Sequence, residues 1–233
     1  MLDILYQDDY LIAINKPSGL LVHKSYYAGA ADEYAIEKLT DQIGKKVHLV
    51  HRLDRKTSGV LLFAFDKETL KLLSDQFMNR EVEKKYLAIL RGWTKNEETI
   101  DYDLTNENEI VQNAITHYRR LQISEIDLPF LTHPTSRYSL VEAIPETGRF
   151  HQLRKHFKHI LHPILGCRKH GCNKQNKLWL NSFNITVMPL HSHQLTLKHP
   201  ITNQNISINA SLNVNPGFLQ IGNILGFDFK EFI

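Results

Sequence analysis

Residues 51–62 read His-Arg-Leu-Asp-Arg-Lys-Thr-Ser-Gly-Val-Leu-Leu, a polar stretch that leads directly into an apolar one. Asp54 stands between two arginines, and a continuous apolar run follows from Val60 to Phe65. A short apolar run of this kind is typical of a buried strand, so we predict a strand over Val60–Phe65 with a polar loop before it. Asp54 could be a catalytic carboxylate, or it could be an ordinary loop carboxylate that pairs with Arg52 or Arg55.

The remaining sequence predicts short strands and amphipathic helices in irregular alternation. Further strands are expected at Leu2–Tyr6, Tyr10–Asn15, Lys85–Leu90, Tyr138–Ile144, Leu195–Leu197 and Ile206–Ile208. Helices are expected over residues 32–43, 67–79 and Phe150–Leu161, where apolar residues recur with helical spacing. This order lacks the regular strand–helix–strand rhythm of a doubly wound parallel sheet, so we predict a mixed α/β fold.

Composition places the chain among single-domain proteins of the cytoplasm. With 42% hydrophobic and 23% charged residues, 233 residues suffice for one sizeable core, and we expect one domain over 1–233. No apolar run approaches the roughly 20 residues that span a bilayer. The first ten residues carry acids where a signal peptide needs positive charge, so we expect a cytoplasmic protein without a membrane partner. The two cysteines, Cys167 and Cys172, are expected to be free thiols in that reducing compartment.

Charge is unevenly distributed along the chain. The first 146 residues hold 18 Lys and Arg against 23 Asp and Glu, whereas residues 147–227 hold nine Lys and Arg and no acid. A concentrated positive field on an acidic body favours a polyanionic partner, although a solvated basic face without any partner would have the same composition.

Several kinds of chemistry lack their sequence signals. There is no glycine-rich phosphate loop and no dinucleotide fingerprint, so no nucleotide cofactor is expected. The histidines between His151 and His162 have no HExxH spacing and no carboxylate nearby to share a metal. Cys167, His170 and Cys172 could supply three zinc ligands, but no fourth is evident, so we expect no metal. No GxSxG element indicates a serine hydrolase.

Three other segments accompany residues 51–62. They are Asn-Lys-Pro-Ser-Gly-Leu-Leu-Val-His at 15–23, Glu-Lys-Lys-Tyr-Leu-Ala-Ile-Leu-Arg-Gly at 83–92, and Thr-Gly-Arg-Phe-His-Gln-Leu-Arg-Lys-His at 147–156 with His-Pro-Ile-Leu-Gly at 162–166. In this order the four segments resemble the RluA-type family of RNA pseudouridine synthases. The resemblance covers roughly residues 2–210. It implies one catalytic domain over 1–233 and no separate N-terminal RNA-binding domain.

The resemblance implies a fold and a reaction. The fold is the pseudouridine synthase fold, a long, mostly antiparallel mixed sheet flanked by helices and loops around a central active-site cleft. The reaction is the isomerisation of a uridine in RNA to pseudouridine by a monomer that needs no cofactor. Residues 114–119, 137–142 and 169–171 are most similar to family members that act on tRNA, at the uridine in position 65 of the T-arm stem.

The resemblance also assigns roles to individual residues. Asp54 would be the nucleophile, and Arg154 would be the cation close to it. Tyr86 would stack on the uracil and take part in proton transfer, and Leu153 would form an apolar wall for the base. Without the family resemblance, Arg154 would be interpreted as a charged residue on the surface of a helix, and Tyr86 as a strand residue that points into the core.

Other residues are expected to bind the RNA. In the family, the arginine two positions before the aspartate, here Arg52, fills the gap that a flipped uridine leaves in its stem. We place His51 and Arg55 beside it. We expect further RNA contacts from three basic residues of the acid-free stretch, Arg149, Lys155 and Lys158.

The chain departs from the family pattern at two places, and three alternative functions stay open. Cys167 stands where the family usually has aspartate, and the insert near residues 104–113 is short. The nearest alternative is a synthase that modifies ribosomal RNA. The second is a non-catalytic RNA-binding or RNA-chaperone protein. The third is a nucleoside-hydrolysing glycosidase, which would need a second catalytic carboxylate that no motif supplies.

Overall fold

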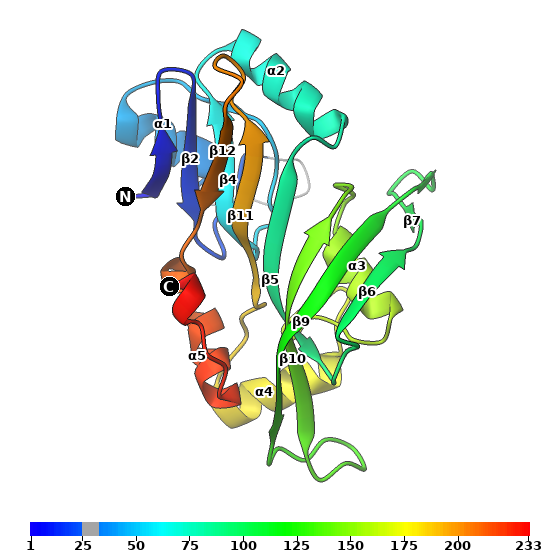
Figure 1. Cartoon of the computed structure of the whole chain (residues 1–233). Helices are drawn as coiled ribbons and strands as arrows, with labels where there is room; N and C mark the ends of the chain where they lie inside the picture. The colour runs from blue at the N-terminus through cyan, green and yellow to red at the C-terminus, as the bar shows by residue number, and fades with distance from the viewer. Residues whose placement is uncertain (25–32) are drawn as a thin grey trace. The chain divides into compact units, whose positions relative to one another are not determined.

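The computed structural model describes residues 1–24 and 33–233, and the chain divides into two compact units. The first unit holds residues 1–84, 192–215 and 232, and the second holds residues 85–191, 216–231 and 233. Figure 1 follows the elements of both along the chain.

The first unit is built on a sheet of mostly antiparallel strands. The order of neighbouring strands is β1 (Asp3–Gln7), β2 (Leu11–Lys16), β4 (Ser58–Ala64) and β11 (Leu190–Lys198). In addition, β3 (His48–Leu49) pairs with β4, and β12 (Asn205–Asn209) pairs with β11. Every residue of β2 and β4 is buried. The strand predicted over Val60–Phe65 is therefore confirmed, with its start two residues earlier.

Two helices accompany this sheet in the first unit. Helix α1 (Ala35–Ile43) ends on Gly44, whose φ of 65° is left-handed, and helix α2 (Lys67–Met78) begins where the Asp66 carboxylate accepts a hydrogen bond from Thr69 N. The helix predicted over 67–79 is confirmed. The first residue of the helix predicted over 32–43 lies outside the described residues. Apolar side chains of β2, β4, α2, β11 and β12 form this unit's core.

The second unit contains four neighbouring antiparallel strands. Their order is β5 (Glu83–Arg91), β10 (Ser136–Pro145), β9 (Ile115–Ile126) and β6 (Glu97–Asp101). A separate two-stranded ribbon, β7 (Leu104–Thr105) with β8 (Val111–Gln112), occupies the short segment noted at 104–113.

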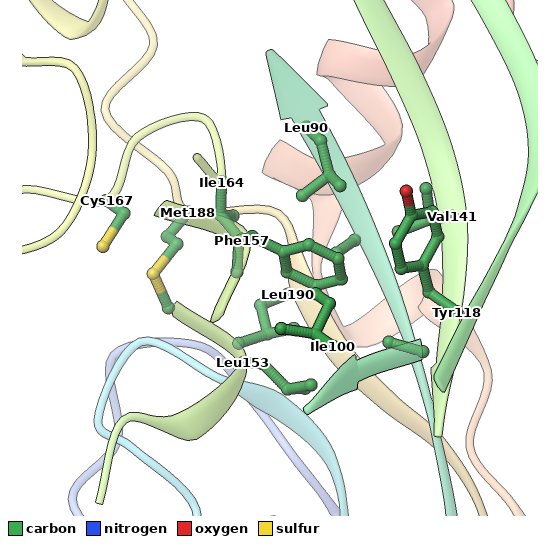
Figure 2. Packing of buried hydrophobic residues seen from close by; sticks show 12 residues of the cluster. Leu90, Ile100, Tyr118, Val141, Leu153, Phe157, Ile164, Cys167, Met188 and Leu190 are labelled. Carbon is green, nitrogen blue, oxygen red and sulfur yellow. The ribbon is translucent and has the colours of Figure 1, made fainter. Parts of the chain in front are cut away.

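Three helices belong to this unit: α3 (Gln152–His159), α4 (Asn173–Phe183) and α5 (Pro216–Leu225). A 3-10 turn lies at Lys230–Phe232, and another, Leu212–Val214, belongs to the first unit. Helix α3 is shorter than the predicted Phe150–Leu161 because His151 and Leu161 have left-handed backbones, with φ of 57° and 64°. Figure 2 shows its apolar face, with Leu153 and Phe157, in a buried cluster that includes Leu90 and Val141 of the sheet.

The structure confirms a mixed α/β fold in which antiparallel sheets are accompanied by helices. Among the described residues, no helix is both long and apolar enough to cross a membrane. The expectation of one catalytic domain over 1–233 stays a prediction.

Candidate active site

In the first unit, Asp54 lies on the loop that leads into β4. Its side chain is half-buried, and its backbone carbonyl accepts a hydrogen bond from Thr57 N at 3.0 Å. The next residue ties this loop to a second one, since Gly19 N donates to Arg55 O at 2.8 Å and Arg55 Nε donates back to Gly19 O at 2.9 Å. Two of the sequence motifs, 15–23 and 51–62, are thus hydrogen-bonded to each other.

Lys16 is the residue that holds these two loops together from inside. Its side chain is fully buried, and Nζ donates to the carbonyl oxygens of Pro17, Leu20 and Arg55 at 2.9, 3.0 and 3.2 Å. Burial lowers the pKa of Lys16 to about 7, and the negative charge of Asp54 opposes that shift. Sequence reasoning missed Lys16. The signal was a lysine placed directly after five apolar or amide residues of a buried strand.

Lys16→Met should destabilise the protein, by about 2–4 kcal/mol, because three carbonyl oxygens lose their buried donor. The loss should grow as pH rises above 7. In that range the unfolded chain, with an ordinary lysine pKa of 10.5, binds more protons than the folded chain, so the native lysine gains stability with pH and methionine does not. Urea unfolding between about pH 6 and pH 9 measures both effects.

The matched control is Lys46→Met, which replaces an exposed lysine of the same unit. It should change the free energy of unfolding by less than about 0.5 kcal/mol at every pH. A Lys16→Met variant as stable as the native protein, or one whose deficit shrinks with rising pH, would contradict this role for Lys16.

The other predicted residues of this loop differ in their surroundings. Arg52 is exposed. His51 accepts a hydrogen bond from Leu62 N through Nε2 and stacks on Phe77, and burial lowers its pKa to about 4, so this side chain is neutral near pH 7. His23 was not predicted, yet its Nδ1 is buried without a hydrogen-bond partner among the described residues. Burial and the charge of Arg52 lower the pKa of His23.

In the second unit, Tyr86 and Leu153 belong to one apolar cluster. Tyr86 is half-buried on β5, opposite Ala143 of β10, and packs against the cluster to which Leu153 and Phe157 contribute from α3. The structure therefore brings together the residue predicted to stack on the base and the residue predicted to wall it.

Helix α3 is fixed to strand β9 by two buried polar side chains. Gln152 accepts hydrogen bonds from Thr147 Oγ1 and Arg149 N, and donates to Ile115 O and Thr116 Oγ1. One turn later, His156 lies 3.0 Å from the same Thr116 hydroxyl. Neither anchor was predicted from sequence, because each looks like an ordinary polar residue of a basic helix.

Arg154 has a contact that involves the family departure at position 167. Its Nε donates to the sulfur of Cys167 at 3.3 Å, and Cys167 is buried. A thiol is a weak, neutral acceptor. The side chain that follows the His-Pro-Ile-Leu-Gly segment therefore contacts Arg154 through a thiol here, in place of the carboxylate that an aspartate would supply.

The basic residues of α3 gather around His170. Burial, together with the positive charges of Arg154, Lys155, Lys169 and Lys158, lowers the pKa of His170 to about 4. The ring also lies 2.9 Å from His151 Nδ1. Two predicted RNA-binding residues make backbone contacts at this end of the unit: Lys155 donates to Thr105 O, and Arg149 Nε donates to Asn113 O.

No group of three or more His, Cys, Asp or Glu side chains could hold a metal ion in the part of the chain that the structure describes. Cys167, His170 and Cys172 do not form such a group. The expectation that the protein works without a metal stays a prediction.

Comparison with known families gives these residues a context. The family model described as RNA pseudouridylate synthase matches residues 10–159, which include the Asp54 loop, Tyr86 and Arg154. The chain belongs to the RNA pseudouridylate synthase family. It is of the RluA type that the four sequence motifs indicated, and it is an isomerase that acts on RNA.

Relatives in this family match the chain over nearly its whole length. A tRNA pseudouridine synthase C of Pasteurella multocida is 44% identical over 99% of this chain and 98% of its own. Proteins of the same name from Haemophilus influenzae and Vibrio parahaemolyticus are 44% and 40% identical, each over 91% of this chain and over 94% and 91% of their own.

Solved structures of pseudouridylate synthases share the fold. Human RNA pseudouridylate synthase domain containing 4 aligns with a TM-score of 0.72 and 26% identity, covering 97% of this chain and 94% of its own. Human RNA pseudouridylate synthase domain containing 1 aligns with a TM-score of 0.71 and 21% identity, covering 93% of this chain and 87% of its own. At this identity the likeness indicates a shared fold only.

Proposed function

We propose that this protein isomerises the uridine at position 65 in the T-arm stem of tRNA, with Asp54 as the nucleophile. The observation that carries the proposal is the Asp54 loop, whose backbone is held by hydrogen bonds between two of the sequence motifs and by the buried Lys16. The choice of tRNA is supported by relatives named tRNA pseudouridine synthase C that match nearly the whole chain.

The reaction suits a carboxylate nucleophile. The N-glycosidic bond of the uridine breaks, the uracil turns over, and the ring rejoins the ribose through carbon. Atoms and electrons balance within the substrate, so no cofactor or energy source is required. Asp54 can form a covalent bond and then leave, either at the ribose C1′ or at the uracil C6.

The second unit would supply the binding groups for the base. Tyr86 would stack on the uracil with its ring and exchange a proton through its hydroxyl, and Leu153 of the same cluster would form an apolar wall. Arg154, whose Nε donates to the Cys167 sulfur, would stabilise the carboxylate nucleophile and negative charge on the uracil oxygens through its guanidinium.

Reaching a uridine inside a stem requires base flipping. Arg52 is exposed beside Asp54 and would enter the space that the flipped base leaves. Arg55 holds the neighbouring loop through Gly19 O, and His51 stacks on Phe77. Both residues would assist RNA binding indirectly, by fixing the backbone that presents Arg52.

Phosphates of the RNA would lie on the cations around His170, together with Arg149. We expect the Lys155→Gln, Lys158→Gln double variant to flatten the dependence of log affinity on log salt by roughly one unit for each phosphate contact removed. Filter binding of tRNA at several salt concentrations measures this slope.

The matched control is Lys67→Gln with Lys71→Gln, which removes the same charge from exposed positions on α2. Its slope should equal that of the native protein. Equal flattening in both double variants would show that net charge matters and not the surface around α3.

The function itself is tested by mapping pseudouridine in total RNA, through chemical derivatisation, from cells with and without this gene. Loss of one modification at tRNA position 65 would support the proposal. Loss of a modification in ribosomal RNA instead would assign the enzyme to the alternative substrate, and an unchanged map would leave a non-catalytic RNA-binding role.

A further inference from the structure

A cavity of about 330 Å³ lies within the second unit, beside helix α4. Its floor is apolar and comes from Leu165, Trp179, Ile185 and Val187. The volume is at the lower end of the range for small-ligand sites, about 300 to 1,000 Å³. Of the described residues, those that line this cavity do not include Tyr86 or Arg154, so it is separate from the groups assigned above to the reacting uridine.

Hydrogen bonds and close packing join the walls of the cavity. Trp179 is buried, and its Nε1 donates to the Tyr138 hydroxyl at 2.7 Å. Asn176 accepts from Gly166 N at 2.9 Å and donates to Cys167 O at 3.1 Å. Gly166 has a φ of 70°, and a Cβ there would lie 1.9 Å from Val187 O. The cavity is therefore preformed, which limits the entropy that a ligand loses on binding.

The rim of the cavity is polar and positively charged. Arg168, Asn173 and Lys177 line it and are exposed, and the last two lie one turn apart on the same side of α4. All lining residues belong to the stretch 147–227, which contains no Asp or Glu. The cavity has an apolar floor, with two cations and an amide at its edge. It therefore suits a ligand in which a planar ring is joined to an anionic group.

We propose that this cavity binds one nucleotide of the RNA substrate other than the uridine that is isomerised. The base would lie on the apolar floor near Trp179, and its phosphate would contact Arg168 and Lys177. Stacking and phosphate contacts of this kind tolerate any base. The site would add affinity and fix the position of the RNA, and it rests on the proposed function because that function supplies the RNA.

Tryptophan fluorescence tests nucleotide binding directly. The chain has two tryptophans, so Trp93→Phe leaves Trp179 in the cavity wall as the only reporter. Uridine 5′-monophosphate should quench this emission saturably at millimolar concentrations. Uridine and inorganic phosphate should each need at least about tenfold more, since each offers one half of the contacts. Adding Arg168→Gln and Lys177→Gln should abolish the nucleotide response.

Matched double variants test whether RNA uses the site. Arg168→Gln with Lys177→Gln should weaken tRNA binding at least about tenfold, while the single-turnover rate at saturating tRNA stays within about twofold. Lys174→Gln with Lys198→Gln removes equal charge from exposed residues of the same acid-free stretch that do not line the cavity, and should weaken binding less than about threefold. Leu180→Trp, which fills the cavity without a change of charge, should weaken tRNA binding as strongly as the first pair.

Three results would overturn the proposal. They are equal weakening of tRNA binding in the two double variants, equal quenching by phosphate alone and by the nucleotide, and no Trp179 response to uridine 5′-monophosphate up to tens of millimolar. These results are separable from failure of the proposed function: the fluorescence reads the cavity whether or not pseudouridine is formed, and pseudouridine mapping does not depend on the cavity.

Discussion

Asp54→Asn should reduce pseudouridine formation at least about 1,000-fold, because an amide oxygen is a poor nucleophile and makes a poor leaving group in the second step. The affinity for tRNA should stay within a few-fold, since the basic residues of the second unit are unchanged. The loop should keep its shape, because its hydrogen bonds to Lys16 and Gly19 come from backbone atoms of Arg55 and from the Arg55 side chain.

Single-turnover assays with excess enzyme and tritium-labelled tRNA separate the chemical step from binding. Asp41→Asn, at an exposed position on α1, makes the same chemical change and should leave the rate unaltered. An Asp54→Asn enzyme that still forms pseudouridine at a tenth of the native rate would remove Asp54 from the role of nucleophile.

Gly59→Ala should cause a large loss of stability in the first unit. Gly59 is in β4 with a φ of 108°, and a Cβ there would lie 2.1 Å from the backbone oxygen of Ser192 and 2.6 Å from its carbonyl carbon. Backbone atoms cannot move aside as a flexible side chain can, so strand β11 would have to shift. We expect a loss of about 3–5 kcal/mol, or a melting temperature lower by roughly 10 °C or more.

Gly44→Ala separates this close approach from the left-handed backbone alone. Gly44 has a φ of 65° and nothing within 4 Å of an added Cβ, so its substitution should cost about 1 kcal/mol. Thermal unfolding of the two variants gives the comparison. If Gly59→Ala does not accumulate as folded protein, the soluble fraction relative to Gly44→Ala serves as the measure. Equal, small losses in both would contradict the packing of β4 on Ser192.

The elements that the sequence predicted are those whose apolar pattern is strong. Strand β4 has seven consecutive buried residues, and α2 and α3 have clear apolar faces. Strand β9 was missed although it spans Ile115–Ile126, because one of its few fully buried positions is Thr116, which hydrogen bonds satisfy in place of apolar packing. Helix α4 was missed because its asparagines weaken the helical signal, and contacts of Trp179 and Gln175 with the Tyr138 hydroxyl stabilise it instead.

The candidate site likewise has features that the sequence predicted and features that only the structure shows. Motif order identified the family and the residues to examine, and the structure adds contacts that join positions far apart in the chain. Nothing local in the sequence indicates that Lys16 donates to Arg55 O or that Cys167 accepts from Arg154. Such contacts depend on tertiary packing, and spacing along a single sequence does not encode them.

The interleaved path of the chain has a consequence for its synthesis. Strand β4 leaves the ribosome early, but its neighbour β11 is made only after residues 85–191, so the first unit must close a very long loop. At about 5–20 residues per second, translation leaves this apolar strand edge without its partner for roughly ten seconds. An unpaired apolar edge is a template for aggregation. During those seconds, any molecule that covers β4 would protect the nascent protein from aggregation, until β11 with Ser192 has been synthesised.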